Sequence, residues 1–425
     1  MGKNYITYKA IVAVLLGNAF EFYCFILFVV LSPYIGKAFF SNANETVSQI
    51  VAYGISFCGY ASRPFGAMLL GNMSDIYSRK KALCWSVLIT GIITFLIGVL
   101  PVYKHVDVIT ILVLIFLRFG QGFLVSGEEG GAAVYLAEVI EGNKKCLIGS
   151  LVLSSVFFGI LSGRVVCNVV EYYSSSQFMY DYGWRIPFLI ALPLALIINR
   201  MRSNVPEIKW QSNIKQTFNF SPIKELFSKY KKCSLQLIMC CSAYASITCF
   251  MMVYLPNACK TYFPAIIFTS GIGVMMIMLP IFGLLSDIVT PGRLLKNGLL
   301  AAIILTVPAV YMLAMPGLLF KSIGLFWLYF NTSLIAAPMF PYLVQSFPRN
   351  NRCTGVSFVF NTSVSIFSGA FPFVCSIINI FNIGILIPAY LIMGLAILSY
   401  VLLLNTSKHA ELFQSTNHVP YRILS

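Results

Sequence analysis

Six charged side chains lie within long apolar stretches, where an ionised group has little water to solvate it. They are Glu21, Arg63, Arg118, Glu128, Glu129 and Arg164. A charge inside a membrane span costs about 3 kcal/mol unless it is paired or hydrated, so each is a candidate for binding substrate or proton. A guanidinium can bind a carboxylate through two parallel hydrogen bonds. A carboxyl group removed from water takes up a proton more easily, so we expect Glu21 and Glu128 to be the proton-coupling residues.

The spacing along one predicted helix places several of these groups. Arg118 and Glu129 are eleven residues apart, which is about three helical turns, so they share a face with Gln121. Glu128 points about a quarter-turn away from that face. Glu21 could pair with Arg63, and Glu128 with a neighbouring arginine. The alternative is that all these charges form ion pairs that only fix helix packing.

The composition is that of a membrane protein built from helices. Apolar residues make up 58% of the 425 residues, charged residues only 10%, and the mean hydropathy is +0.83. A soluble domain carries about 25% charged residues. A helix needs about 20 apolar residues to cross a bilayer, and twelve stretches meet this need: 11–35, 49–71, 82–102, 108–134, 147–170, 184–201, 234–256, 264–286, 295–313, 318–345, 354–376 and 381–404. The sequence therefore predicts an all-α membrane protein with twelve transmembrane helices.

The basic residues predict the orientation of the chain in the membrane. Of 29 Lys and Arg residues, 21 fall on the side of the N-terminus, the central loop and the C-terminal tail, and four fall on the other. The positive-inside rule then makes both termini cytoplasmic, which requires an even number of spans. The net charge of +15 is thus a topology signal, and we expect a lipid bilayer rather than nucleic acid as partner.

A short segment occurs twice, half a chain apart. Residues 71–83 (GNMSDIYSRKKAL) and 283–295 (GLLSDIVTPGRLL) share Gly, Ser, Asp, Ile and Leu at a constant offset of 212. Parallel repeats about an axis along the membrane normal are known in transporters. We therefore expect an N-terminal six-helix half (1–201), a central cytoplasmic loop (202–233), a C-terminal six-helix half (234–404) and a cytoplasmic tail (405–425).

The repeated segment has the residues of a cytoplasmic gate. The gating candidates are Gly71, Asp75, Arg79, Lys80, Gly283, Asp287 and Arg293. Each Asp could pair with loop cations or face the N-terminus of a neighbouring helix, whose dipole favours an anion. Such contacts would hold the cytoplasmic side shut. The alternative is that these charges only anchor the loops in water.

The motifs resemble those of a known family. Gly71, Asp75, Arg79 and Lys80 match the loop pattern G-x-x-x-D-R-x-G-R-K of the major facilitator superfamily. GNAFEFYCFILF (17–28), ASRPFGAMLLG (61–71) and RFGQGFLVSGEEGGAAVYLAE (118–138) resemble motifs of its metabolite:proton symporters, which include proline/betaine carriers. The resemblance implies the twelve-helix major facilitator fold and proton-coupled transport of a small metabolite.

Three residues depart from the family pattern. Cys24 stands where the family has an Asp, Glu129 replaces an aromatic residue, and Arg164 adds a charge in the fifth span. The first removes a protonation site, and the others add charge to the transport path. The second half has no charged residue within a predicted span, so its candidates are polar residues such as Asn361.

The sequence thus predicts a secondary transporter rather than an enzyme. No P-loop pattern for an ATP-driven pump occurs, and the three His residues form no metal or catalytic cluster. We expect a monomer in the inner membrane that moves a small zwitterion or organic acid together with protons, without cofactor or metal. The rival hypotheses are a proton-independent facilitator or exchanger, and a membrane sensor that transports nothing.

Overall fold

The fold is described from a computed structural model. It describes residues 2–39, 45–101, 108–140, 144–205, 207, 220–255, 265–371, 375 and 386–416. Within these ranges the regular structure is helical throughout. Tail residues from 417 onwards and most of the central loop lie outside the described residues.

The first part of the chain forms six long helices and three short ones. They are α1 (Gly2–Val30), α2 (Ser32–Phe39), α3 (Glu45–Ile76), α4 (Arg79–Val99), α5 (Val108–Val139), α6 (Lys145–Tyr173), α7 (Ser176–Asp181), η1 (Gly183–Arg185) and α8 (Ile186–Ser203). The long helices cover most of the predicted spans 11–35 to 184–201, although span 11–35 continues into α2 and span 82–102 extends past the end of α4. The last of these, however, ends later than predicted, at Ser203, which brings Arg202 into the helix.

The second part of the chain has more interrupted helices. They are α9 (Ser221–Ser228), α10 (Lys231–Cys240), α11 (Ser242–Cys249), η2 (Phe250–Tyr254), α13 (Ala265–Val289), α14 (Pro291–Ala314), α15 (Leu318–Ala336), α16 (Met339–Gln345), η3 (Arg349–Asn351), α17 (Arg352–Ser363), η4 (Val364–Ser368) and α19 (Leu386–Thr416). η2 and η4 are π-helical turns, a feature that is frequent at functional sites.

Ten helical stretches of the described chain are long and apolar enough to cross a membrane. The other two predicted spans correspond to α3, which covers 49–71, and to α17 with η4. The end of span 354–376 and the beginning of span 381–404 fall partly outside the described residues. The chain is therefore multi-pass, as the hydropathy pattern predicts.

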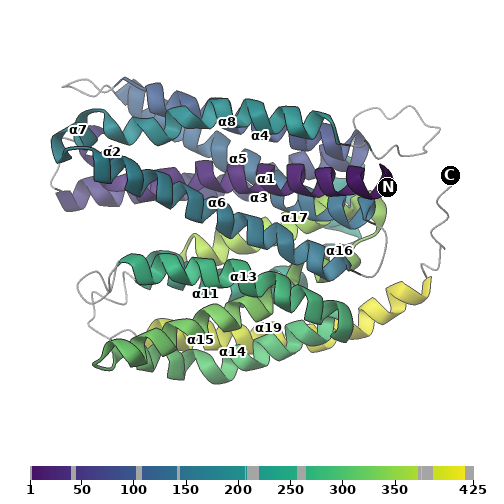
Figure 1. The fold of residues 1–425 in the computed structure, drawn as a ribbon. Helices are drawn as coiled ribbons and strands as arrows, with labels where there is room; N and C mark the ends of the chain where they lie inside the picture. Colours follow the sequence, from purple (N-terminus) through teal and green to yellow (C-terminus); the bar gives the residue numbers. More distant parts are fainter. Residues whose placement is uncertain are drawn as a thin grey trace.

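The helices gather in two groups that meet along two seams. Helices α1 to α8 lie on one side of the molecule, and α11 to α19 lie mostly on the other (Figure 1). Contact across the boundary is made mainly by α17 against α3 and by α13 against α6. α1 begins and α19 ends at the same end of the molecule (Figure 1), as an even number of spans requires.

Glycines set the distance between neighbouring helices of the first group. A Cβ on Gly122 of α5 would collide with the backbone carbonyl of Gly59 on α3, and a Cβ on Gly159 of α6 would collide with that of Ala19 on α1. Small residues at such positions let helix backbones approach closely in a membrane. The packing of α3 on α5 and of α1 on α6 thus depends on glycine at these positions, because one added methyl group would collide with the neighbouring helix.

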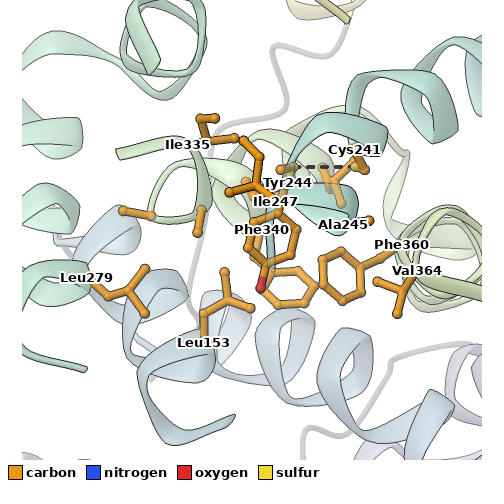
Figure 2. Close-up of a cluster of buried hydrophobic side chains, with 14 of the residues drawn as sticks. Leu153, Cys241, Tyr244, Ala245, Ile247, Leu279, Ile335, Phe340, Phe360 and Val364 are labelled. Atoms are coloured by element: carbon orange, nitrogen blue, oxygen red, sulfur yellow. Dashed lines mark hydrogen bonds between the residues drawn. The ribbon is translucent and has the colours of Figure 1, made fainter. Parts of the chain in front are cut away.

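An apolar cluster fills the space where the two groups meet. Leu153 of α6 faces the rings of Phe340 and Phe360 from the second group (Figure 2). The two rings lie 4.7 Å apart between centroids, and Tyr244 lies 6.0 Å from Phe360. This cluster closes the space between the groups in this conformation.

The glycine contacts predict opposite effects for two similar substitutions. Gly159→Ala should lower the free energy of unfolding by about 1–3 kcal/mol, because the new methyl group overlaps a backbone carbonyl. The methyl group added by Gly394→Ala, at an exposed position of α19, meets nothing within 4 Å. The better helix propensity of Ala should therefore raise the free energy of unfolding by up to about 1 kcal/mol. Thermal unfolding in detergent would measure both. Equal effects would contradict the close approach of α1 and α6.

Candidate transport site

The aspartate of the first repeated segment contacts a helix N-terminus in the other half of the chain. Asp75, at the end of α3, accepts hydrogen bonds from the backbone N–H of Cys353 (3.0 Å) and of Thr354 (2.8 Å), and from the Thr354 hydroxyl (2.8 Å). These are the first free N–H groups of α17, where the helix dipole favours an anion. Gly71 makes room for the contact, because its Cα faces that of Thr354 without a side chain between them.

The aspartate of the second segment makes the mirrored contact. Asp287, near the end of α13, accepts hydrogen bonds from the backbone N–H of Cys146 (2.7 Å) and of Leu147 (3.0 Å) at the start of α6. Gly283 packs against the backbone of Leu147. The sequence left two contacts open for these aspartates, one with loop cations and one with a helix N-terminus. Both aspartates make the helix N-terminus contact, and Asp75 also lies 3.7 Å from Arg79.

A charge cluster reinforces the first of these contacts. Glu138 of α5 forms ion pairs with Arg79 from its own half and with Arg349 and Arg352 from the other. At the offset of 212, the counterpart of Arg79 is Pro291. None of Glu138, Arg349 and Arg352 was predicted as a site residue from the sequence. The signal for Glu138 was its position as the last residue of the 118–138 motif.

The other residues predicted for the gate lie apart from these bridges. Lys80 is half-buried beside a small cavity next to Arg202, and Arg293 is exposed at the start of α14. Neither carries the contact of its neighbouring aspartate, which is made by backbone N–H groups instead.

Deeper in the first seam, a buried ion pair contacts the second half. The Arg63 guanidinium donates to Glu129 at 2.6 Å and to the amide oxygen of Asn361 on α17 at 2.8 Å. The Asn361 amide nitrogen in turn donates to the backbone carbonyl of Ser126. The expected pairing of Glu21 with Arg63 is wrong, because Glu129, the carboxylate that replaces an aromatic residue, occupies that position.

Glu128 pairs with an arginine that the sequence placed in the central loop. Arg202 lies near the end of α8, is 2% exposed, and donates from both terminal nitrogens to the Glu128 carboxylate. It also donates to the backbone carbonyls of Ala13, Val14 and Leu83. Its assignment to the loop was wrong because hydropathy locates a helix end only within a few residues.

Glu21 is fully buried without a cation of its own. One carboxylate oxygen accepts hydrogen bonds from Ser86 and Thr90 on α4. The other oxygen has no hydrogen-bond partner within the described residues. Glu21 is therefore the carboxyl group with the weakest compensation among the described parts of the first half.

Arg118 and Gln121 form a polar pair between α5 and α1. The Arg118 guanidinium donates to the Gln121 side chain and to the backbone carbonyl of Phe25, and it lies 4.2 Å from the Phe25 ring centroid. Gln121 donates to the carbonyl of Cys24 at 2.9 Å. Two Arg118 nitrogens have no hydrogen-bond partner in the described part of the chain.

Arg164 lies where the two groups of helices face each other. Its guanidinium reaches from α6 to the backbone carbonyl of Met252 in η2, at 3.5 Å. Among the described residues no acidic oxygen lies within 4.0 Å of it, and its Nε has no hydrogen-bond partner. Tyr329 of α15 is close enough to interact with it electrostatically. Arg164 is thus a partly buried cation that could accept an external anion.

A cavity of about 110 Å³ lies beside the Phe340 ring, between the two groups of helices. It is lined by Ala133, Ala137, Lys145, Gly149, Phe340, Pro341, Val344, Gln345 and Arg352. Because Lys145 begins α6 and Arg352 begins α17, the cavity is at the end of the molecule where the aspartate contacts lie.

These features together define a membrane transporter with two facing helical halves. The sequence model of the Major Facilitator Superfamily matches residues 14–372, and the chain belongs to this family. The fold is shared with solved structures of the same class. One is the proton:xylose symporter XylE bound to 6-bromo-6-deoxy-D-glucose, at 14% identity and a TM-score of 0.69 over 96% of both chains. Another is the human organic anion transporter MFSD10, at 13% identity and a TM-score of 0.70 over 93% of this chain and 99% of the other.

The sequence is similar to particular transporters over nearly its whole length. It is 29% identical to the proline/betaine transporter of Escherichia coli K12 over 415 residues, covering 92% of this chain and 82% of the relative. It is 28% identical to the glycine betaine/proline/ectoine/pipecolic acid transporter OusA of Dickeya dadantii, covering 92% and 81%. The twelve-helix fold predicted from the sequence is confirmed by these matches.

The aspartate contacts predict a change in the reactivity of native cysteines. Cys353 is 0% exposed and lies under the Asp75 contact. Asp75→Ala removes three hydrogen bonds to a charged group, worth about 1.5–3 kcal/mol each. Alkylation of Cys353 by a soluble maleimide, followed by mass spectrometry, should therefore become at least about 10-fold faster.

Two controls accompany this measurement. Cys167 is buried near the end of α6 that is remote from the Asp287 contact. Its labelling rate should be unchanged, which would exclude general unfolding. Asp181→Ala removes an exposed carboxylate and should leave Cys353 protected. Unchanged protection of Cys353 in Asp75→Ala would show that the seam does not depend on this contact.

Proposed function

We propose that this transporter carries a small zwitterion or organic acid across the membrane by alternating access, with protons coupled to the movement. The observation that supports the substrate class is Arg164, a partly buried guanidinium at the boundary between the halves with no acidic partner among the described residues. A substrate carboxylate would complete its hydrogen bonds in the bidentate geometry that guanidinium favours. Arg118 is a second incompletely paired cation in the first half.

Aromatic rings on the π-helical turn that Arg164 contacts favour a zwitterion over a simple acid. The contact of Arg164 falls on η2, in which the rings of Phe250 and Tyr254 are stacked at 5.4 Å. Phe371 lies 6.3 Å from Phe250. Aromatic faces bind quaternary and secondary ammonium groups through cation–π attraction. The names of the bacterial relatives, which include proline and glycine betaine as substrates, point to the same class.

The two seams support a mechanism of alternating access. In our proposal the halves are residues 1–201, extended to Ser203, and 234–404, and the loop between them and both termini are cytoplasmic. The Asp75 and Asp287 contacts then close the cytoplasmic side, and substrate enters from the other side toward Arg164. One chain contains both seams, so we propose that the monomer is the transporting unit.

A proton-independent facilitator or exchanger is the rival function. It is favoured by Cys24, which is 0% exposed and occupies the place where related transporters have an Asp. In the proton-coupled mechanism Glu21, on the same helix, takes over the role of the missing carboxylate. The two functions differ in their response to a pH gradient and not in their substrates.

Uptake into proteoliposomes separates these functions. Labelled proline, glycine betaine, ectoine, pipecolic acid and a set of mono- and dicarboxylates would be offered with and without an inward pH gradient. We expect accumulation of a zwitterion that increases with the gradient. Uptake that ignores the gradient would leave only the facilitator or exchanger. No uptake of any compound by folded protein would contradict transport of this substrate class.

Replacement of Arg164 should weaken substrate binding without unfolding the protein. Arg164→Ala removes a charge-assisted hydrogen bond worth about 1.5–3 kcal/mol, so KM should rise by about 10- to 100-fold. Arg164→Lys keeps the charge but loses the bidentate geometry, and its KM should be intermediate. Arg200→Ala, at an exposed position of α8, is the matched control. If only the yield of folded Arg164→Ala falls, while KM is unchanged, Arg164 has a packing role.

A further inference from the structure

Three buried groups of the first half have charges that do not balance. Glu21 on α1, Glu128 on α5 and Arg202 on α8 are each at most 2% exposed. Arg202 pairs with Glu128 through both terminal nitrogens. Two carboxyl groups therefore share one cation, and if both were ionised, a net negative charge would remain in a dry part of the protein. A buried carboxyl group without a counter-ion is neutral, because an isolated ion is too costly there.

The other groups around Glu21 do not supply the missing positive charge. On α1 its neighbours are Asn18, which donates to Val152 and Ser155 of α6, and the Cys24 thiol. On α4 they are Ser86 and Thr90, both of which are neutral donors, with Cys84 and half-buried Lys80 farther toward Arg202. Arg202 on α8 is the cation that interacts with Glu21, but the side chain to which it donates hydrogen bonds is Glu128. Charge balance thus requires one proton on the carboxyl pair.

We infer that Glu21 and Glu128 share one exchangeable proton, with Arg202 as its fixed counter-charge, and that this proton leaves to the cytoplasm within the first half of the chain. The inference rests on the proposed function, since it specifies where the coupled proton is held. In the transfer, the O–H bond of Glu21 breaks and an O–H bond forms on Glu128. During this transfer the total charge of the three groups stays at zero, and it becomes negative only when the proton is released to water on the cytoplasmic side. Arg202 acts as a positioning residue, because its bonds to three backbone carbonyls keep it in place when Glu128 is neutral.

A small cavity lies on the route that we propose for the proton. It measures about 10 Å³, near the minimum for one water molecule. Its lining residues are Val14, Lys80, Leu83, Tyr135, Arg202 and Val205. All of them belong to the first group of helices except Val205, which comes just after α8, whereas the seams that substrate must cross are formed by α3 with α17 and by α6 with α13. The proton and the substrate therefore reach the cytoplasm by different routes.

Infrared spectroscopy of the reconstituted protein tests the shared proton without any transport. At neutral pH the wild type should show a band of a protonated carboxyl group that shifts in heavy water. Glu21→Gln should remove it, and Glu171→Gln, at an exposed carboxylate, should not. Glu128→Gln should also remove it, although Glu21 is intact, because Arg202 then has only the Glu21 carboxylate to balance. A band that persists in Glu21→Gln or in Glu128→Gln, or that is absent from the wild type, overturns the inference.

Transport tests the role and the route of the proton. Glu21→Gln should reduce accumulation driven by a pH gradient at least 10-fold but keep exchange of labelled for unlabelled substrate, which needs no proton release. Val205→Phe fills the small cavity and should slow gradient-driven accumulation about 10-fold while exchange continues. Leu284→Phe, at an exposed position of α13, is its control. Equal loss of both activities in Val205→Phe overturns the separate route.

The same assays distinguish this inference from the proposed function. If wild-type uptake ignores the gradient while exchange proceeds, proton coupling fails and the inference falls with it. If wild-type uptake follows the gradient and Glu21→Gln still accumulates substrate, coupling survives and only the assignment to Glu21, Glu128 and Arg202 is overturned.

Discussion

A carboxylate placed against the N-terminus of a helix in the opposite half, used twice, is the contact on which this conformation depends. The first N–H groups of α6 and α17 have no partner within their own helices, and Asp287 and Asp75 supply one for each. The contact is possible only because Gly71 and Gly283 let the backbones meet. The apolar cluster around Phe340 and Phe360 then fills the space that these contacts enclose. A polar bond that can be broken and remade suits a moving seam better than a permanent apolar interface.

The buried charges divide into those that are neutralised and those that are not. Glu129 neutralises Arg63, and the pair reaches the second half only through the uncharged Asn361. The halves can thus separate there without leaving either charge unpaired, since Arg63 and Glu129 move together. Glu21, Arg118 and Arg164 lack such a partner among the described residues, and we assign the proton to Glu21 and the substrate to Arg164.

Much of the fold could be predicted from the sequence, and the reasons are physical. Apolar runs of about 20 residues determine membrane spans almost alone, and a repeat of Gly, Ser and Asp at an offset of 212 indicates two related halves. The ion pairs could not be predicted, because pairing depends on how helices rotate and approach, which one sequence does not determine. Arg202 is the clearest case. Its position one residue before the end of α8 made it look solvated, but its long side chain is buried against α1 and Glu128.

The absence of a counterpart to Arg79 makes the two seams mechanically unequal. Among the described residues, the seam of α3 with α17 is held by Asp75, by the Glu138 cluster and by Asn361, and the seam of α6 with α13 is held by Asp287 and by the hydrogen bond from Ser154 to the carbonyl of Met276. With Pro291 at the position of Arg79, the second seam has no cation there that could tie its aspartate to such a cluster. The two seams would then not open at the same time. The seam of α6 with α13 would open first. The seam of α3 with α17 would act as a hinge until the ion pairs of Glu138 break.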